Sequence, residues 1–494
     1  MEEIFSRFPH IGEKIMERLD NTHLTECRVV DRFWRSCIDN QKFLWMRIIY
    51  GNGLDSKEWE ETCRKFCVEK VKILAKTVLQ FYTDGIDQNC QTPLAIAAIS
   101  GNTEMVAKLF KKEAFENQHG LPFHHSAKHA NLEVCQFFIK NIDDKNPKDI
   151  EGLTPLHTAA ENGQFQVCKM ILDVTDDKNP KTFDVIGGYT PLHKAAANNH
   201  SLICDLIIRN ILDANPKDYG KRTPLHYAAK KGHLEVCRVI LSNVKEKNPR
   251  DKNGDTPLHY AMERGYTEIC RLIIECAEDK NPSGGCGGIT PYHMAAEFGN
   301  LDVCQLLIEN VREEHPREEN GYSPIHFAAD DGQLEAFKLI FKNVKDKSPT
   351  TRNGSTPLHL VAENGHVELC KFIIENDTNL NPQKDDGITP LHLAAKAGHL
   401  AIFKLLFRVL ENKSPKSESK NTPLHYAAGR GNLEVCRFIL NNIKNLNRIY
   451  RKNANGKTPL DKASEEGHTE VCELLKLYGD LPKHPHKRPR FFNM

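Results

Sequence analysis

A tetrapeptide close to Thr-Pro-Leu-His recurs twelve times along the 494-residue chain. Most successive copies lie 33 residues apart, and their prolines are Pro93, Pro122, Pro155, Pro191, Pro224, Pro257, Pro291, Pro324, Pro357, Pro390, Pro423 and Pro459. This period is too regular for chance and too long for one helix. The chain is therefore predicted to be a stack of structural repeats, whose length counts modules and not separate globular cores.

Residues 251–274 illustrate the fold expected of one repeat. The polar, glycine-containing residues 251–255 are typical of a turn, and Thr256 followed by Pro257 is typical of a helix start. Gly265 is expected to end this first helix. Apolar residues at helical spacing in 269–274 predict a second helix. Each unit is thus predicted to be turn, helix, turn, helix.

Two stretches, residues 223–236 and 422–435, carry Thr-Pro-Leu-His-x-Ala-Ala followed by Gly-His-x-Glu-Val or nearly so. These residues resemble the ankyrin repeat, and the resemblance extends over residues 85–478 as twelve repeats. It implies an all-α solenoid of stacked helix-turn-helix units with β-turn fingers. In that family the fingers and first helices line a partner-binding surface, so the resemblance implies recognition of a protein and not catalysis.

Histidines and cysteines also recur at fixed places in the repeat. The family uses the motif histidine for hydrogen bonds between loops. Nine cysteines share one position that holds Val106, Phe337 or Phe403 in other repeats, which indicates an apolar, reduced, structural side chain. They are Cys135, Cys168, Cys204, Cys237, Cys270, Cys304, Cys370, Cys436 and Cys472. We expect no metal, cofactor or catalytic site, with a metal or redox role for the cysteines as the alternative.

Residues 1–50 have a different character, because they contain no Thr-Pro-Leu element and their apolar spacing predicts three short helices. Their apolar positions, in order, are Phe8-Pro9, Ile15-Met16, Leu19, Leu24, Val30, Trp34 and Leu44-Trp45. This pattern resembles an F-box, which implies docking to the Skp adaptor of a cullin-RING ubiquitin ligase. The residues expected to insert against the adaptor are Phe8, Pro9, Ile11, Ile15 and Leu19.

Two functions follow from this organisation. The first is the substrate-recognition subunit of a Skp-cullin-F-box ubiquitin ligase, with the ankyrin array binding an unidentified target protein. The alternative is a non-degradative scaffold or inhibitor in which the N-terminal helices only cap the array. Residues 51–84 are predicted to be a helical linker or N-terminal cap in either case.

The residue before each Thr-Pro pair has no evident folding role, and it is expected to project from the finger toward a partner. It is large and apolar at Tyr189, Ile289, Tyr322 and Ile388, and Phe298 follows nearby at the end of a first helix. Aromatic anchors are typical of interface hot spots. These five residues are the predicted partner-binding set. The glycine-rich residues 284–288 lack the Lys-Ser/Thr of a phosphate loop and are interpreted as a flexible finger.

Charge and hydropathy limit the remaining function classes. Lysine and arginine number 67 and aspartate and glutamate 66, so the net charge of +1 gives no general reason to bind nucleic acid or a membrane. No secretory or transmembrane pattern is found. A cytoplasmic location is expected. The basic tail, residues 479–494, is expected to be disordered and is either a nuclear signal or a solvated terminus.

Overall fold

The computed structural model describes residues 93–111, 121–183, 187–285, 287–311, 315–442 and 451–479. The described residues do not include 1–50, 51–84 or the basic run after 479. The predicted adaptor-binding residues Phe8, Pro9, Ile11, Ile15 and Leu19 therefore lie outside the described residues. Within the described ranges all regular secondary structure is helical, and the helices come in pairs. The predicted all-α repeat architecture is confirmed.

The first helix of each pair begins at or next to the repeat proline. These helices are α8 (Pro93–Ile99), α11 (Leu121–Lys128), α13 (Pro155–Glu161), α15 (Pro191–Ala197), α17 (Pro224–Lys231), α19 (Pro257–Glu263), α21 (Pro291–Glu297), α23 (Pro324–Asp330), α25 (Pro357–Asn364), α27 (Pro390–Ala397), α29 (Pro423–Gly429) and α31 (Pro459–Glu465). The second helices are α9 (Thr103–Leu109), α12 (Leu132–Asn141), α14 (Phe165–Leu172), α16 (Ser201–Asn210), α18 (Leu234–Asn243), α20 (Thr267–Cys276), α22 (Leu301–Asn310), α24 (Leu334–Asn343), α26 (Val367–Asn376), α28 (Leu400–Val409), α30 (Leu433–Asn442) and α32 (Thr469–Gly479).

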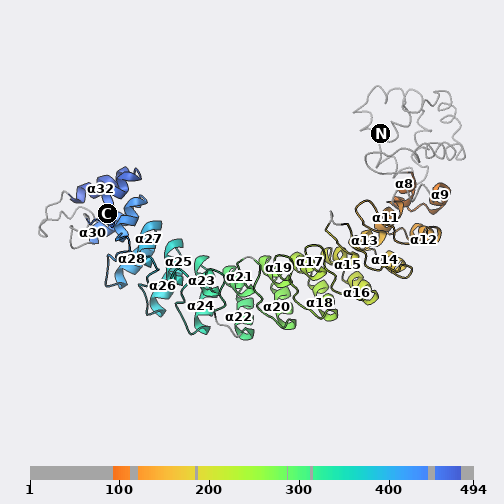
Figure 1. Ribbon diagram of the computed structural model, residues 1–494, viewed down its shortest axis with the longest axis horizontal. Helices are drawn as coiled ribbons and strands as arrows, with labels where there is room; N and C mark the ends of the chain where they lie inside the picture. The colour runs from red at the N-terminus through yellow and green to blue at the C-terminus, as the bar shows by residue number, and fades with distance from the viewer. Residues whose placement is uncertain are drawn as a thin grey trace, which may run out of the picture. The chain divides into compact units, whose positions relative to one another are not determined.

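The chain divides into two compact units, residues 1–228 with 235–244, and residues 229–234 with 245–494. In the first unit α11 packs on α13 and α13 on α15, while α12 packs on α14. In the second unit α21 packs on α23 and α25 on α27, while α20 packs on α22 and α22 on α24, so first and second helices form separate layers (Figure 1). Each unit is a two-layer stack in which a repeat buries its apolar face against its neighbours.

Small and apolar side chains fill the space between the layers. Leu156, Ala159 and Ala160 of α13 are fully buried, and the alanines leave room for the next helix. Burial of one leucine side chain contributes about 1.5–3 kcal/mol. The repeat cysteine on the second helix is buried in eight repeats and half-buried at Cys472, and all of these are free thiols. Burial raises the pKa of Cys168 to about 12, so its thiol is neutral and packs as an apolar group.

The ends of the first helices follow the sequence signals. Thr154 is the N-cap of α13, where its side chain accepts a hydrogen bond from the His157 amide, and Pro155 is the first helical residue. Gly265 adopts a left-handed conformation with φ 71° after α19, and Asn199 does the same with φ 63° after α15. Ala130 also does so, with φ 58°, although its Cβ disfavours this conformation.

Candidate protein-binding surface

Each ring nitrogen of a motif histidine has its own partner, one within its repeat and one in the next. His359 Nδ1 lies 3.1 Å from the Thr356 amide nitrogen, and its Nε2 lies 3.1 Å from the Ile388 carbonyl oxygen. The Thr356 N–H can only donate, so Nδ1 accepts and Nε2 carries the proton that is donated to the carbonyl. The same pair of contacts occurs in other repeats, for example at His157 with Thr154 and Tyr189. The expected loop-to-loop hydrogen bonding by these histidines is confirmed.

Burial keeps these imidazoles neutral. It lowers the pKa of His157 to about 3 and that of His359 to about 4. A neutral ring with both nitrogens engaged in hydrogen bonds has no site left for a metal or for proton transfer. In the described residues, no three His, Cys, Asp or Glu side chains are grouped so that they could hold a metal ion.

The residue before each Thr-Pro pair has a folding role after all, but it is carried by the main chain. The Tyr322 carbonyl accepts a hydrogen bond from His293 Nε2 at 3.0 Å, and its amide donates to Glu318 Oε1 at 2.9 Å. Since neither contact involves the Tyr322 side chain, any residue with a backbone amide hydrogen can occupy this position. The finger backbone is therefore fixed while its side chain is free to vary with the partner.

Tyr189, in the first unit, joins an aromatic and cationic cluster. Its ring meets that of Tyr227 edge-on at 5.7 Å between centroids. Lys194 Nζ lies 5.7 Å from the Tyr189 ring centroid, and the Arg222 guanidinium lies 5.3 Å from that of Tyr227. The buried Asp218 carboxylate accepts hydrogen bonds from Arg222 and from the Tyr227 hydroxyl. The chain thus supplies its own cations to the aromatic rings of this surface.

The other four predicted partner residues lie in the second unit, spread over several repeats. Ile289 and Tyr322 occupy successive fingers, and the Tyr322 ring packs edge-on against His326 at 5.6 Å. Phe298 is 48% exposed. It is the C-cap of α21, whereas Ile289 precedes that helix, so the helix length of about 10 Å separates the two residues. Ile388 is half-buried on a more distant finger. Of the four, Ile289 lines a pocket described below.

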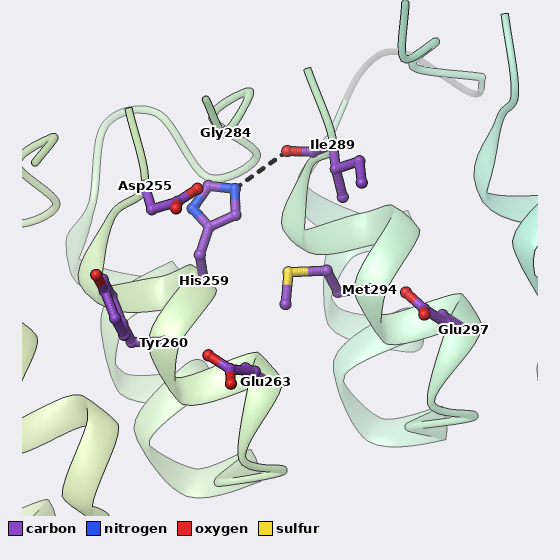
Figure 2. A pocket seen from close by; sticks show the side chains of 8 residues that line it. All are labelled: Asp255, His259, Tyr260, Glu263, Gly284, Ile289, Met294 and Glu297. Atoms are coloured by element: carbon purple, nitrogen blue, oxygen red, sulfur yellow. Dashed lines mark hydrogen bonds between the residues drawn. The ribbon is translucent and has the colours of Figure 1, made fainter. Parts of the chain in front are cut away.

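This pocket, of about 310 Å³, lies between α19 and α21 (Figure 2). Its lining residues are His259, Tyr260 and Glu263 from α19, Met294 and Glu297 from α21, and Asp255, Gly284 and Ile289 from two fingers. Glu263 and Glu297 are the last residues of their helices, and Met294 lies between them and the Ile289 finger (Figure 2). Carboxylates therefore line the pocket from both helices, and Met294 and Ile289 supply apolar surface on the α21 side.

Two residues in the pocket lining depart from the repeat pattern, Met294 and Gly284. Met294 stands three residues after the repeat proline, where the repeats on either side place Tyr260 and Phe327. Gly284 donates its amide to the Ile289 carbonyl, as Asp251 does to the Asp255 carbonyl, but it has no side chain to fill the finger. A Cβ at Gly284 would lie 3.0 Å from His259 Nε2. The smaller side chain of Met294 leaves space open, whereas Gly284 allows the finger to approach Asp255 and His259 closely.

Sequence reasoning did not single out Tyr260, Met294 and Glu297 as lining residues, because it took the partner-binding set from the fingers and from the helix end at Phe298. The signal lies in the repeat register, since positions three and six residues after the proline vary while the two positions between them are mostly alanine. Tyr260, Met294 and Glu297 are all partly exposed, whereas Leu258, Ala261 and Ala295 are buried.

A family model for ankyrin repeats, described as three copies, matches residues 62–149, 123–218, 192–284, 278–351, 325–414 and 407–483. The first match begins inside the segment assigned as linker or cap. No curated protein matches the sequence. In the described part of the chain no helix is long and apolar enough to cross a bilayer. Paired helices, histidine-linked fingers and six overlapping matches agree, and the chain belongs to the ankyrin repeat family.

Proposed function

We propose that the protein is the substrate-recognition subunit of a Skp-cullin-F-box ubiquitin ligase. Ankyrin repeats imply binding to a protein partner, and the array matched over residues 62–483 would supply the target-binding surface. The observation that carries the ligase proposal is the F-box-like order of apolar residues in 1–50 joined to that array. In this account Phe8, Pro9, Ile11, Ile15 and Leu19 contact the adaptor.

Such a subunit accelerates ubiquitin transfer by proximity, because it holds a target lysine near the charged conjugating enzyme. It needs no nucleophile or base of its own, and no catalytic site is proposed. The motif histidines and cysteines support this proposal, since both are engaged in hydrogen bonding or packing. The protein would act in the cytoplasm, or in the nucleus if the basic tail is a nuclear signal.

On the array, the proposed partner-binding residues are Tyr189, Ile289, Phe298, Tyr322 and Ile388. Their main chains are fixed by inter-repeat hydrogen bonds or helix caps, so little backbone entropy is lost on binding. Phe298 has the largest exposed apolar surface among them. Large side chains on a rigid backbone are the arrangement that interface hot spots favour.

The adaptor proposal is tested by co-purifying the full chain with a Skp-type adaptor. Wild type is expected to form a stable complex, and Ile15→Asp with Leu19→Asp is expected to abolish it because charges replace apolar contacts. Tyr322→Ala is the control and should leave the complex intact, since it alters only the array. Absence of a wild-type complex, or one that survives the double substitution, would contradict the proposal.

A second candidate is a non-degradative scaffold or inhibitor whose N-terminal residues only cap the array. One observation favours this candidate: the family match begins at residue 62 and does not extend to the first fifty residues. A cap would bury its apolar face against the first repeat and would not bind an adaptor. The same co-purification separates the two functions.

A further inference from the structure

The pocket between α19 and α21 has the size and walls suited to one long side chain. Its volume of about 310 Å³ is at the low end of the range for ligand sites, roughly 300–1,000 Å³. Ile289 and Met294 offer apolar surface, while Glu263 and Glu297 offer carboxylates at the helix ends (Figure 2). A lysine or arginine side chain has the matching character, because its methylene stem is apolar and its head is charged.

The residues that line the pocket carry a net negative charge, and nearby cations neutralise only part of it. Glu263 pairs with Arg264 at 3.7 Å, but both side chains are about half exposed and the pair is weak. Among the described residues no cation pairs with Glu297. Burial, and then Asp331 and Asp330, raise its pKa, so its environment disfavours the carboxylate. His259 adds no positive charge, because burial lowers its pKa.

The preceding repeat carries a cation that the two repeats lining the pocket lack at the same position. Lys230, six residues after its repeat proline, places its Nζ 5.3 Å from the Tyr260 ring centroid. Glu263 and Glu297 occupy the same position in the next two repeats, so the chain supplies no such cation to the side of the pocket lined by Met294. A carboxylate at a helix C-terminus is also unfavourable for the helix itself, since the helix dipole is negative there.

We propose that this pocket binds a lysine or arginine side chain from a basic segment of the partner protein. The cationic head lies between Glu263 and Glu297, and the stem packs on Met294 and Ile289. The inference rests on the proposed recognition of a protein by the array, and it does not depend on ligase recruitment.

The test uses the full chain and a fluorescein-labelled peptide in which lysine alternates with leucine and serine, monitored by fluorescence anisotropy. Glu263→Gln with Glu297→Gln should weaken binding about tenfold, the sum of two partly exposed ion pairs. The matched control is Glu335→Gln with Glu368→Gln, which removes the same charge from the second helices α24 and α26. A peptide with norleucine in place of lysine should not bind.

A steric variant tests the cavity without altering charge. Met294→Phe introduces the side chain that the next repeat already places at Phe327, so the fold should tolerate it while the pocket fills. Binding of the lysine peptide should fall at least as far as in the double glutamine variant. Glu297→Gln should leave the thermal midpoint unchanged or higher, because it removes a disfavoured charge, whereas a structural role would lower it.

Equal weakening by the control pair, or unchanged binding by Met294→Phe, would overturn the proposal. So would binding that appears only after the tail cations Lys483, Lys487, Arg488 and Arg490 are replaced by serine, since the occupant would then be this chain's own basic tail. Failure of these tests leaves the adaptor experiment unaffected. A chain that binds the adaptor but not the peptide refutes the pocket alone.

Discussion

At the scale of single residues, the motif histidine acts as a hydrogen-bond acceptor and donor at once. It accepts from the threonine amide of its own repeat and donates to a carbonyl of the next, as His293 does to Tyr322. In the last described repeat Asp461 takes this position and accepts hydrogen bonds from the Thr458 amide and hydroxyl. An acceptor suffices there, because no further described repeat presents a carbonyl that needs a donor.

The buried histidines predict a stability that depends on pH. The folded pKa is about 4 at His193, His293, His326, His359 and His392, below the ordinary value of 6.5. Between these values the unfolded chain binds more protons, so stability is complete above pH 6.5 and is lost as pH falls toward 4. At pH 5 each such histidine should cost about 2 kcal/mol. Urea unfolding at pH 7.5 and pH 5 measures this, and equal midpoints would contradict the assignment of neutral, buried rings.

At the scale of the helical element, the turn after each first helix contains one left-handed residue, and several of these turns also form an inter-repeat hydrogen bond. Gly365 has φ 90°, and His399 of the next repeat directs its Nε2 to the Glu363 carbonyl at 3.0 Å. This contact satisfies a carbonyl at the end of α25 that the helix itself leaves unpaired. The turn therefore ends one helix and positions the next repeat.

Alanine substitutions should separate these two contributions. A Cβ at Gly265 would meet no atom within 4 Å, so Gly265→Ala should cost only the backbone term, about 1 kcal/mol. A Cβ at Gly365 would lie 2.7 Å from His399 Cε1, so Gly365→Ala should cost more because that ring must move. Conversely, Ala130→Gly should stabilise the protein by about 1 kcal/mol. Urea denaturation of the three variants measures the order, and equal losses for both glycines would contradict it.

At the scale of the whole molecule, features that recur in every repeat could be predicted and features that differ between repeats could not. The helix pairs, the Thr256 and Pro257 helix start and the buried cysteines follow from the period, because each copy repeats the same physical constraint. The pocket depends on the smaller Met294 side chain and on the close approach of the Gly284 finger to α19. Both are departures from the repeat pattern, and their combined effect cannot be derived from the pattern of a single repeat. Phe298 was correctly expected at a helix end, but its distance from Ile289 required the structure.

The proposed function requires that one chain bind an adaptor and a target at separate places. Light scattering coupled to size-exclusion chromatography, on the chain mixed with a Skp-type adaptor and the labelled lysine peptide, tests this directly. The account predicts a single species that contains all three components, with Ile15→Asp and Leu19→Asp losing only the adaptor and Met294→Phe losing only the peptide. An adaptor that never co-elutes with the chain, or that displaces the peptide from it, would contradict the account.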